Sequence, residues 1–240
     1  MRWFQRNPIL VLFLVLMAAN SFRSGQYANF GDFLMSMAIV LPGIVLGITV
    51  HEFAHAFSAY RLGDPTPKQM GRVTLNPLAH IDPVGIIALI FVHFGWGKPV
   101  VVNPYAFRTH RRLKNIVVDV AGVVTNFVVA FLLMGLLYAL LIRGVSAGGI
   151  GYQIAYYAVM MNVILMLFNL LPIPPLDGFG ILTEIFDLRR FRWYEAFYNN
   201  GSIILLVLIL FNITSGLLTP GMNAVFGFLA NTWGALGGWS

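Results

Sequence analysis

Cysteine is absent from this chain, and charged residues are scarce. The absence of cysteine excludes disulfide bonds and a thiol nucleophile. Charged residues make up 10% of the 240 residues, whereas hydrophobic residues make up 58% and the mean hydropathy is +0.79. These values lie far outside the range of soluble globular domains. The composition therefore indicates an all-α polytopic membrane protein embedded in the lipid bilayer.

Long apolar runs predict the helices that cross the membrane. An α-helix needs about 20 predominantly apolar residues to span a hydrocarbon core of about 30 Å. The sequence predicts about five to six transmembrane helices, the first of them behind Arg2 and Arg6. It leaves open whether residues 1–22 are cleaved as a signal peptide and whether residues 84–96 or 222–239 cross the membrane. The clearest runs are residues 8–22, 33–50, 116–142, 154–171 and 203–218.

Lysine and arginine residues orient these runs, since positive charge accumulates in cytoplasmic loops. With the N-terminus in the cytoplasm, 13 of the 15 basic residues fall on the cytoplasmic side, and only Arg23 and Arg143 fall outside. The short run 86–94 is then re-entrant or interfacial, because a full crossing would separate residues 98–114 from residues 61–72. The net charge of +6 reflects this topology and the lipid headgroups, and it gives no support for nucleic-acid binding.

The sequence His51-Glu52-Phe53-Ala54-His55 forms an HExxH motif at the end of a long apolar run. Two histidines four residues apart lie on one face of a helix, so both imidazoles can bind one metal ion. Glu52 is offset by about 100° from His51, which suits a general base better than a metal ligand. Ionisable groups at membrane depth are costly, so such a cluster is a candidate functional site. A structural metal, or histidines that only meet lipid headgroups, are the alternatives.

A second polar group reaches the same level of the membrane. The fourth long run leads into residues 169–178, Asn-Leu-Leu-Pro-Ile-Pro-Pro-Leu-Asp-Gly. The prolines interrupt the helix and Gly178 permits a tight turn, so Asp177 can lie on irregular backbone that faces a cavity. A catalytic zinc ion takes three protein ligands and keeps one position open for water. His51, His55 and Asp177 supply three, although Leu-Asp-Gly alone is also typical of a turn or a helix cap.

These paired motifs resemble the site-2 protease family of intramembrane zinc metalloproteases, peptidase family M50. The resemblance covers most of residues 33–180 and is that of the compact form, without PDZ or CBS domains. One departure is Val123, where relatives often carry proline after Ala-Gly. On this basis we expect three parts: residues 1–32 as a first transmembrane helix with an external loop, residues 33–180 as the metalloprotease core, and residues 181–240 as C-terminal transmembrane or interfacial helices. Further stretches that look like those of the family are residues 71–83, 95–104 and 121–126.

The resemblance implies a cofactor, a chemistry and a substrate class. It places one Zn²⁺ ion per chain on His51, His55 and Asp177. It makes Glu52 the catalytic acid/base, and Asn169 a candidate donor to the oxyanion or an amide that bonds between helices. The implied activity is hydrolysis of peptide bonds in membrane-embedded substrates, as in regulated intramembrane proteolysis. The active site would lie toward the cytoplasmic side of a multi-pass protein of the cell membrane.

A transmembrane substrate must be unwound locally, because a helix hides its backbone. Residues 98–103 are expected to form a short β-like edge strand near the active site, which either pairs with the extended substrate or only covers the site. His80 and Asp82 are expected to fix the neighbouring loop by hydrogen bonds. Asn126 is expected to hydrogen-bond between helices.

Two other functions are compatible with the motif. A zinc peptidase of another architecture would take Glu195 as its third ligand. A membrane metal transporter would place ionisable groups along a path, whereas here Glu52 and Asp177 share one level and only Asp119 stands apart. The sequence identifies neither the substrate and its cleavage site, nor a regulatory partner, nor the oligomeric state.

Overall fold

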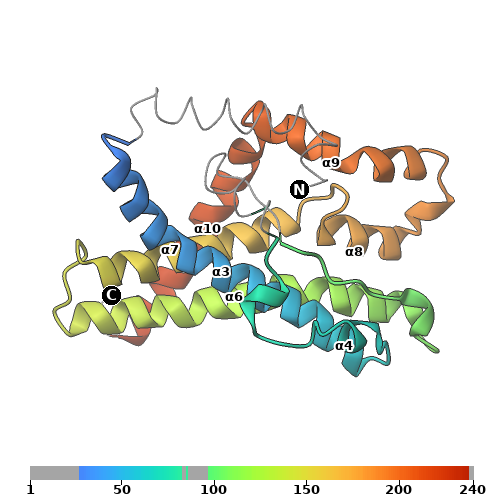
Figure 1. Cartoon of the computed structure of the whole chain (residues 1–240), viewed down its shortest axis with the longest axis horizontal. Helices are drawn as coiled ribbons and strands as arrows, with labels where there is room; N and C mark the ends of the chain where they lie inside the picture. Colours follow the sequence, from blue (N-terminus) through green and yellow to red (C-terminus); the bar gives the residue numbers. More distant parts are fainter. Residues whose placement is uncertain (1–26, 83–84, 86–96, 238–240) are drawn as a thin grey trace.

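The computed structural model of the chain describes residues 27–82, 85 and 97–237. Within these residues every regular element is a helix (Figure 1). The predicted first span, residues 8–22, and the short run 86–94 lie outside the described residues. The α-helices are α3 (Phe30–Arg61), α4 (Thr66–Gln69), α6 (Arg111–Ile142), α7 (Ile150–Asn169), α8 (Asp177–Phe186), α9 (Tyr194–Leu210) and α10 (Ile213–Leu236), and the 3-10 helices are η1 (Pro77–Ala79), η2 (Pro104–Ala106) and η3 (Leu188–Arg190).

Four of the described helices are long and apolar enough to cross a membrane: α3, α6, α7 and α10. They contain 32, 32, 20 and 24 residues, respectively, and a helix of 20 residues is about 30 Å long. Three of the predicted runs therefore lie in helices that are long and apolar enough to span a membrane. The prediction of an all-helical membrane fold is confirmed.

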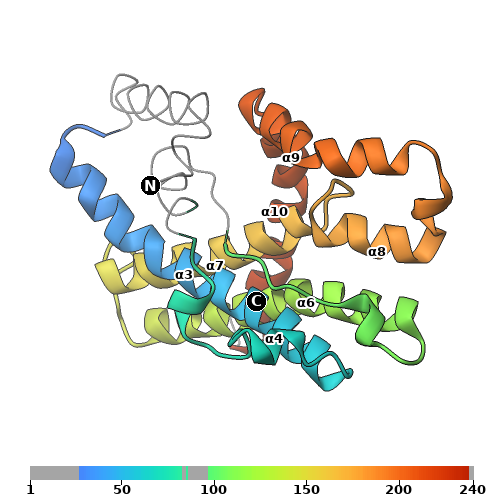
Figure 2. The ribbon, with the colours of Figure 1, turned by 45° about the vertical axis from the view of Figure 1, so that its right-hand side comes forward.

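Helices α3, α6 and α7 pack against one another and form the core of the fold (Figures 1 and 2). Small residues allow this close approach, as is common between helices in membranes. A Cβ atom on Gly43 of α3 would lie 2.6 Å from Ala158 Cα of α7. A Cβ atom on Gly135 of α6 would lie 2.5 Å from the Trp233 ring of α10. Substitution of either glycine would therefore push two helices apart.

The basic residues gather at one end of this helix bundle. The C-terminal end of α3, the N-terminal end of α6 and the C-terminal end of α7 lie together, on the right in Figure 1. Apart from Arg143, the lysines and arginines of the described residues belong to the loops and helix ends at this side. Arg143 follows α6 at the opposite end. This asymmetry is the one that the sequence predicted from its basic residues.

The predicted span at residues 203–218 is wrong. Helix α9 ends at Leu210, and α10 begins at Ile213. Between them Asn212 adopts the left-handed conformation with φ 56°, which asparagine tolerates better than most residues. Hydropathy averages over this single polar residue and therefore does not reveal the break. Residues 222–236 belong to α10, whose length suffices for a span.

The predicted edge strand at residues 98–103 is not formed in the described residues, whose only β-type pairing is an isolated antiparallel bridge between Ile81 and Gly97. Next to this bridge the Lys98 N–H donates to the His80 carbonyl over 2.7 Å. Beyond it the backbone groups of the segment bind side chains of the protein core instead of a neighbouring strand. These backbone groups are therefore not available for a β-ladder with another part of the chain.

Candidate metal centre and catalytic site

Three side chains from two distant parts of the chain converge in the core. His51 and His55 lie one turn apart on α3, where both are buried, and Asp177 is the first residue of α8. The two Nε2 atoms are 3.0 Å apart, and each lies 3.3 Å from Oδ2 of Asp177. The i, i+4 spacing of the histidines places them on one helix face. The sequence thus predicted the three residues that the fold brings together.

The local structure around Asp177 differs from the expectation. Asp177 begins a helix instead of lying on irregular backbone. The chain folds sharply before it, since a Cβ atom on Gly178 would lie 2.2 Å from the Leu170 carbonyl oxygen. Oδ2 of Asp177 is buried and accepts no hydrogen bond. This oxygen is therefore not used as a helix cap and is directed at the two imidazoles.

The donor set fits a zinc ion. Tetrahedral zinc binds nitrogen and oxygen at about 2.0 to 2.2 Å, so its ligand atoms lie about 3.3 Å from one another. The three atoms of His51, His55 and Asp177 match this spacing. A buried carboxylate oxygen without a hydrogen bond is costly unless a cation compensates it. Three protein ligands would also leave one position for water, as in catalytic zinc sites.

Hydrogen bonds on the far side of each imidazole fix its tautomer. Nδ1 of His51 donates to Oδ1 of Asn126 over 2.7 Å, and Nδ1 of His55 donates to the Val118 carbonyl over 2.8 Å. Each ring then carries its proton on Nδ1. Both Nε2 lone pairs are consequently available at the side that faces Asp177.

Asn126 belongs to a buried chain of amides that links three helices. Its Nδ2 donates to the Gly47 carbonyl of α3 over 3.1 Å and to Oδ1 of Asn162 on α7 over 3.0 Å. Asn162 in turn donates to the Ala158 carbonyl. The expectation of an interhelical amide is confirmed for Asn126. Its contact with His51 and the part played by Asn162 were missed, although a polar residue within an apolar run is the signal that points to them.

Gly122 of α6 provides the room for both imidazoles. A Cβ atom at this position would lie 2.5 Å from Nε2 of His55 and 2.7 Å from Cε1 of His51. Real Cβ atoms do not approach heavy atoms so closely. A side chain at residue 122 would therefore displace the two rings from their present geometry.

Glu52 does not belong to the metal group and binds the neighbouring extended segment, as its place on the helix predicts. Its Oε2 accepts a hydrogen bond of 2.9 Å from the backbone N–H of Val100. Two further buried side chains hold the same extended segment. The Arg72 guanidinium donates to the carbonyls of Ala79 and Lys98, and Oδ2 of the buried Asp64 accepts from the Asn103 N–H over 2.7 Å. Residues 98–103 are thereby fixed across Glu52.

The other sequence candidates make different contacts. Asn169 at the end of α7 donates from Nδ2 to the Leu165 carbonyl of its own helix over 2.9 Å. Glu195 is exposed in the first turn of α9 and does not belong to the group. His80 is fully buried and its Nε2 bonds to the Thr74 carbonyl over 2.8 Å, which confirms its role in the loop. In the described part of the chain, the group of His51, His55 and Asp177 is the only such set of three metal-binding side chains.

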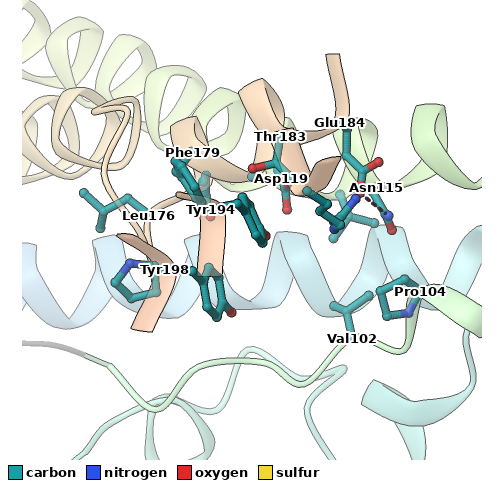
Figure 3. Close-up of a pocket in the computed structure, with 15 residues that line it drawn as sticks. Val102, Pro104, Asn115, Asp119, Leu176, Phe179, Thr183, Glu184, Tyr194 and Tyr198 are labelled. Carbon is teal, nitrogen blue, oxygen red and sulfur yellow. Dashed lines mark hydrogen bonds and ion pairs between the residues drawn. The ribbon is translucent and has the colours of Figure 1, made fainter. Parts of the chain in front are cut away.

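A cavity of about 360 Å³ opens beside Asp177, between α6, α8 and α9 (Figure 3). Its polar wall contains Glu184, which is buried and accepts on Oε1 from Asn115 Nδ2 over 2.7 Å and from Arg189 over 2.8 Å. The hydrogen bond from Arg189 to Glu184 raises the pKa of that guanidinium above its usual value. The guanidinium therefore remains charged at any physiological pH.

Helices long enough to cross a membrane surround a group of two histidines and one aspartate that can hold a metal ion, as in a membrane-bound metallopeptidase. Comparison with known proteins agrees with this class. The model of the family described as "Peptidase family M50" matches residues 142–212, a range that contains Asp177.

Curated relatives match over more of the chain. The "Putative zinc metalloprotease YwhC" of Bacillus subtilis is 37% identical over 196 residues, which are 80% of this chain and 89% of that protein. The "Putative zinc metalloprotease Rip2" of Mycolicibacterium smegmatis is 33% identical over 219 residues, which are 89% of this chain and 77% of that protein. The chain belongs to peptidase family M50, and its cofactor is Zn²⁺. No solved structure matches the chain.

Proposed function

We propose that this protein is an intramembrane zinc endopeptidase that hydrolyses peptide bonds of membrane-embedded substrates near the cytoplasmic face, in regulated intramembrane proteolysis. The observation that carries the proposal is the meeting of Nε2 of His51, Nε2 of His55 and Oδ2 of Asp177 within 3.3 Å of one another. Glu52 follows His51 directly on the same helix. A helical site with this donor set and an adjacent carboxylate suits metal-assisted hydrolysis.

The proposal assigns His51, His55 and Asp177 as the protein ligands of one Zn²⁺ ion. When bound, zinc supplies a water molecule of lowered pKa and polarises a carbonyl group. Asn126 and the Val118 carbonyl are positioning groups, because they bind Nδ1 of the two imidazoles and leave each Nε2 unprotonated.

Glu52 is the proposed acid/base. The Val100 N–H occupies Oε2 and fixes the orientation of the carboxylate. Oε1 then takes a proton from the attacking water and delivers it to the nitrogen of the leaving amine. A hydrogen bond to one oxygen thus leaves the other for proton transfer.

Asn169 is the proposed donor to the oxyanion. One hydrogen of its Nδ2 is engaged by the Leu165 carbonyl. An amide group carries two such hydrogens, so the second can reach a substrate oxygen. Asn169 and Asp177 flank the same proline-containing turn between α7 and α8. This arrangement supports a role for both residues at one substrate.

Residues 33–180 form the proposed metalloprotease core, and residues 181–240 the C-terminal helices. The basic end of the bundle is assigned to the cytoplasm of a cell-membrane protein, because positive residues accumulate there. The metal group lies toward this end, since His55 is followed closely by the basic C-terminus of α3. An unwound substrate is proposed to lie along residues 98–103, close to Glu52.

Reconstitution into liposomes tests the proposal. The purified protein is incubated with single-span membrane peptides, and products are identified by mass spectrometry. Chelation should stop cleavage, and stoichiometric zinc should restore it. The same vesicles report zinc flux through an entrapped indicator. Zinc flux without any peptide hydrolysis would reject the protease and favour a transporter.

A further inference from the structure

The cavity beside Asp177 is lined by more carboxyl groups than basic groups. Three carboxylates line it, Asp119 from α6 and both Asp177 and Glu184 from α8, together with one guanidinium, that of Arg189. Arg189 is engaged by Glu184 in an ion pair of 2.8 Å. Among the described residues no basic side chain pairs with Asp119. Asp177 belongs to the metal group, so Asp119 is the one carboxyl group of the cavity that has no ion-pair partner among the described residues.

The position of Asp119 is fixed by its neighbour on α8. A Cβ atom on Gly180 would lie 2.4 Å from Oδ2 of Asp119, so the carboxylate rests directly against the glycine backbone. Figure 3 shows Asp119 beside Thr183 on one side of the cavity, with Val102 and Pro104 on the opposite side. The space between these walls is open to a ligand.

A second polar group in the cavity wall also lacks a partner. Thr183 is 1% exposed, and its Oγ1 makes no hydrogen bond in the described part of the chain. A buried hydroxyl without a hydrogen bond costs free energy. A ligand that carries several N–H donors would satisfy both Thr183 and Asp119. Lysine and arginine side chains carry such donors.

Another part of the cavity wall is aromatic. The rings of Phe179 and Tyr194 stack at a centroid distance of 5.7 Å, and those of Tyr194 and Tyr198 at 5.9 Å. All three residues line the cavity. Aromatic surfaces accept the alkyl stem of a long basic side chain and attract its cationic end. The wall thus matches the apolar part of the ligand that the carboxylate selects.

We propose that this cavity binds one lysine or arginine side chain of the substrate, and that Asp119 determines this specificity. The inference rests on the proposed protease function. Membrane segments carry lysine and arginine at their cytoplasmic ends, which is the end where the proposed active site lies. A basic residue held next to Asp177 fixes the register of the substrate, so that a nearby peptide bond is presented to Glu52.

The experiment measures cleavage of a set of single-span peptides in liposomes. Each peptide carries lysine, arginine, glutamine or glutamate at one test position. The test position is moved in turn through the residues around the scissile bond. We expect one position at which lysine raises kcat/KM about tenfold over glutamine, as a charge-assisted hydrogen bond would. Asp119→Asn should bring this ratio close to one. The matched control Asp187→Asn should retain it, because Asp187 pairs with Arg112 at the surface and asparagine tolerates its left-handed backbone.

Several results would overturn the inference. The wild-type enzyme could show no preference for a basic residue at any position, or Asp119→Asn could keep the wild-type ratio. If Asp119→Asn is inactive, binding of the peptides is compared by photocrosslinking instead. The two proteins compared are Glu52→Gln and the double variant Glu52→Gln with Asp119→Asn. An unchanged preference for lysine in the double variant would exclude the role of Asp119. Failure of the wild-type enzyme to cut any peptide would refute the proposed function itself, whereas cleavage without a lysine preference refutes only the inference.

Discussion

Nδ1 of His51 donates a hydrogen bond of 2.7 Å to Oδ1 of Asn126, seventy-five residues further along the chain. This contact joins α3 to α6 and sets the tautomer of the imidazole. Asn126 is itself held by the Gly47 carbonyl and by Asn162 of α7. The packing of three helices is thereby coupled to the orientation of one proposed zinc ligand.

Replacement of Asn126 by alanine should weaken zinc binding. His51 would lose the acceptor that fixes its ring, and loss of such an outer contact typically reduces metal affinity about 10- to 100-fold. Zinc content is measured after dialysis against buffers of defined free zinc. Asn200→Ala serves as the control, because Asn200 is exposed and bonds only within α9. Equal zinc affinity in Asn126→Ala and the wild type would contradict the coupling.

Gly122→Ala should abolish zinc binding and peptide cleavage. The added methyl group would lie 2.5 Å from Nε2 of His55 and would displace both imidazoles. Gly216→Ala is the matched control, since a Cβ atom there meets nothing within 4 Å and alanine is a better helix former than glycine. Zinc content and thermal unfolding in detergent are compared. A Gly122→Ala protein with full zinc occupancy would show that the rings are not confined as described.

Removal of zinc should lower the thermal stability of the protein. A ligand that binds only the folded state stabilises it by about 2.7 kcal/mol at a concentration of 100 times its Kd. Unfolding is followed in detergent before and after chelation, and again after titration with zinc. The double exchange of His51 and His55 to alanine should remove the dependence on zinc. A zinc-dependent Tm that persists in this variant would place the metal elsewhere.

Asp64→Ala should slow cleavage without removing zinc. Asp64 is fully buried, and its two oxygens accept from the Thr66 and Asn103 N–H groups. Its loss would leave both donors unpaired, at a cost of about 1–3 kcal/mol each, and would release one end of residues 98–103. The kcat/KM for a membrane peptide and the zinc content are measured together. Asp32→Ala, at the exposed start of α3, should leave both values unchanged.

Sequence patterns predicted well those features that depend on neighbours along the chain. The apolar runs anticipated α3, α6 and α7, and the spacing of His51 and His55 anticipated their common face. Asp177 was found through its proline-containing motif and a family resemblance. Periodicity and composition are local signals, and these elements are determined locally.

The particular partners that helix packing gives to a side chain were not predicted. The rotation of α6 against α3 decides that Asn126 meets His51, and no spacing along the chain encodes it. The Val100 N–H likewise donates a hydrogen bond to Glu52 instead of to a neighbouring strand, and this contact also depends on packing between distant parts of the chain. At Asn212 a single left-handed residue divides an apolar run that hydropathy reads as continuous.

The exchange Glu52→Gln separates the proposed acid/base from the proposed zinc ligands. Glutamine keeps the size of the side chain and can still accept the Val100 N–H, but it cannot take a proton from water. Zinc content and the cleavage rate of a membrane peptide are measured on the same preparation. We expect unchanged zinc binding and a cleavage rate about 10²- to 10⁴-fold lower. A variant that retains zinc and cuts at the wild-type rate would contradict this expectation.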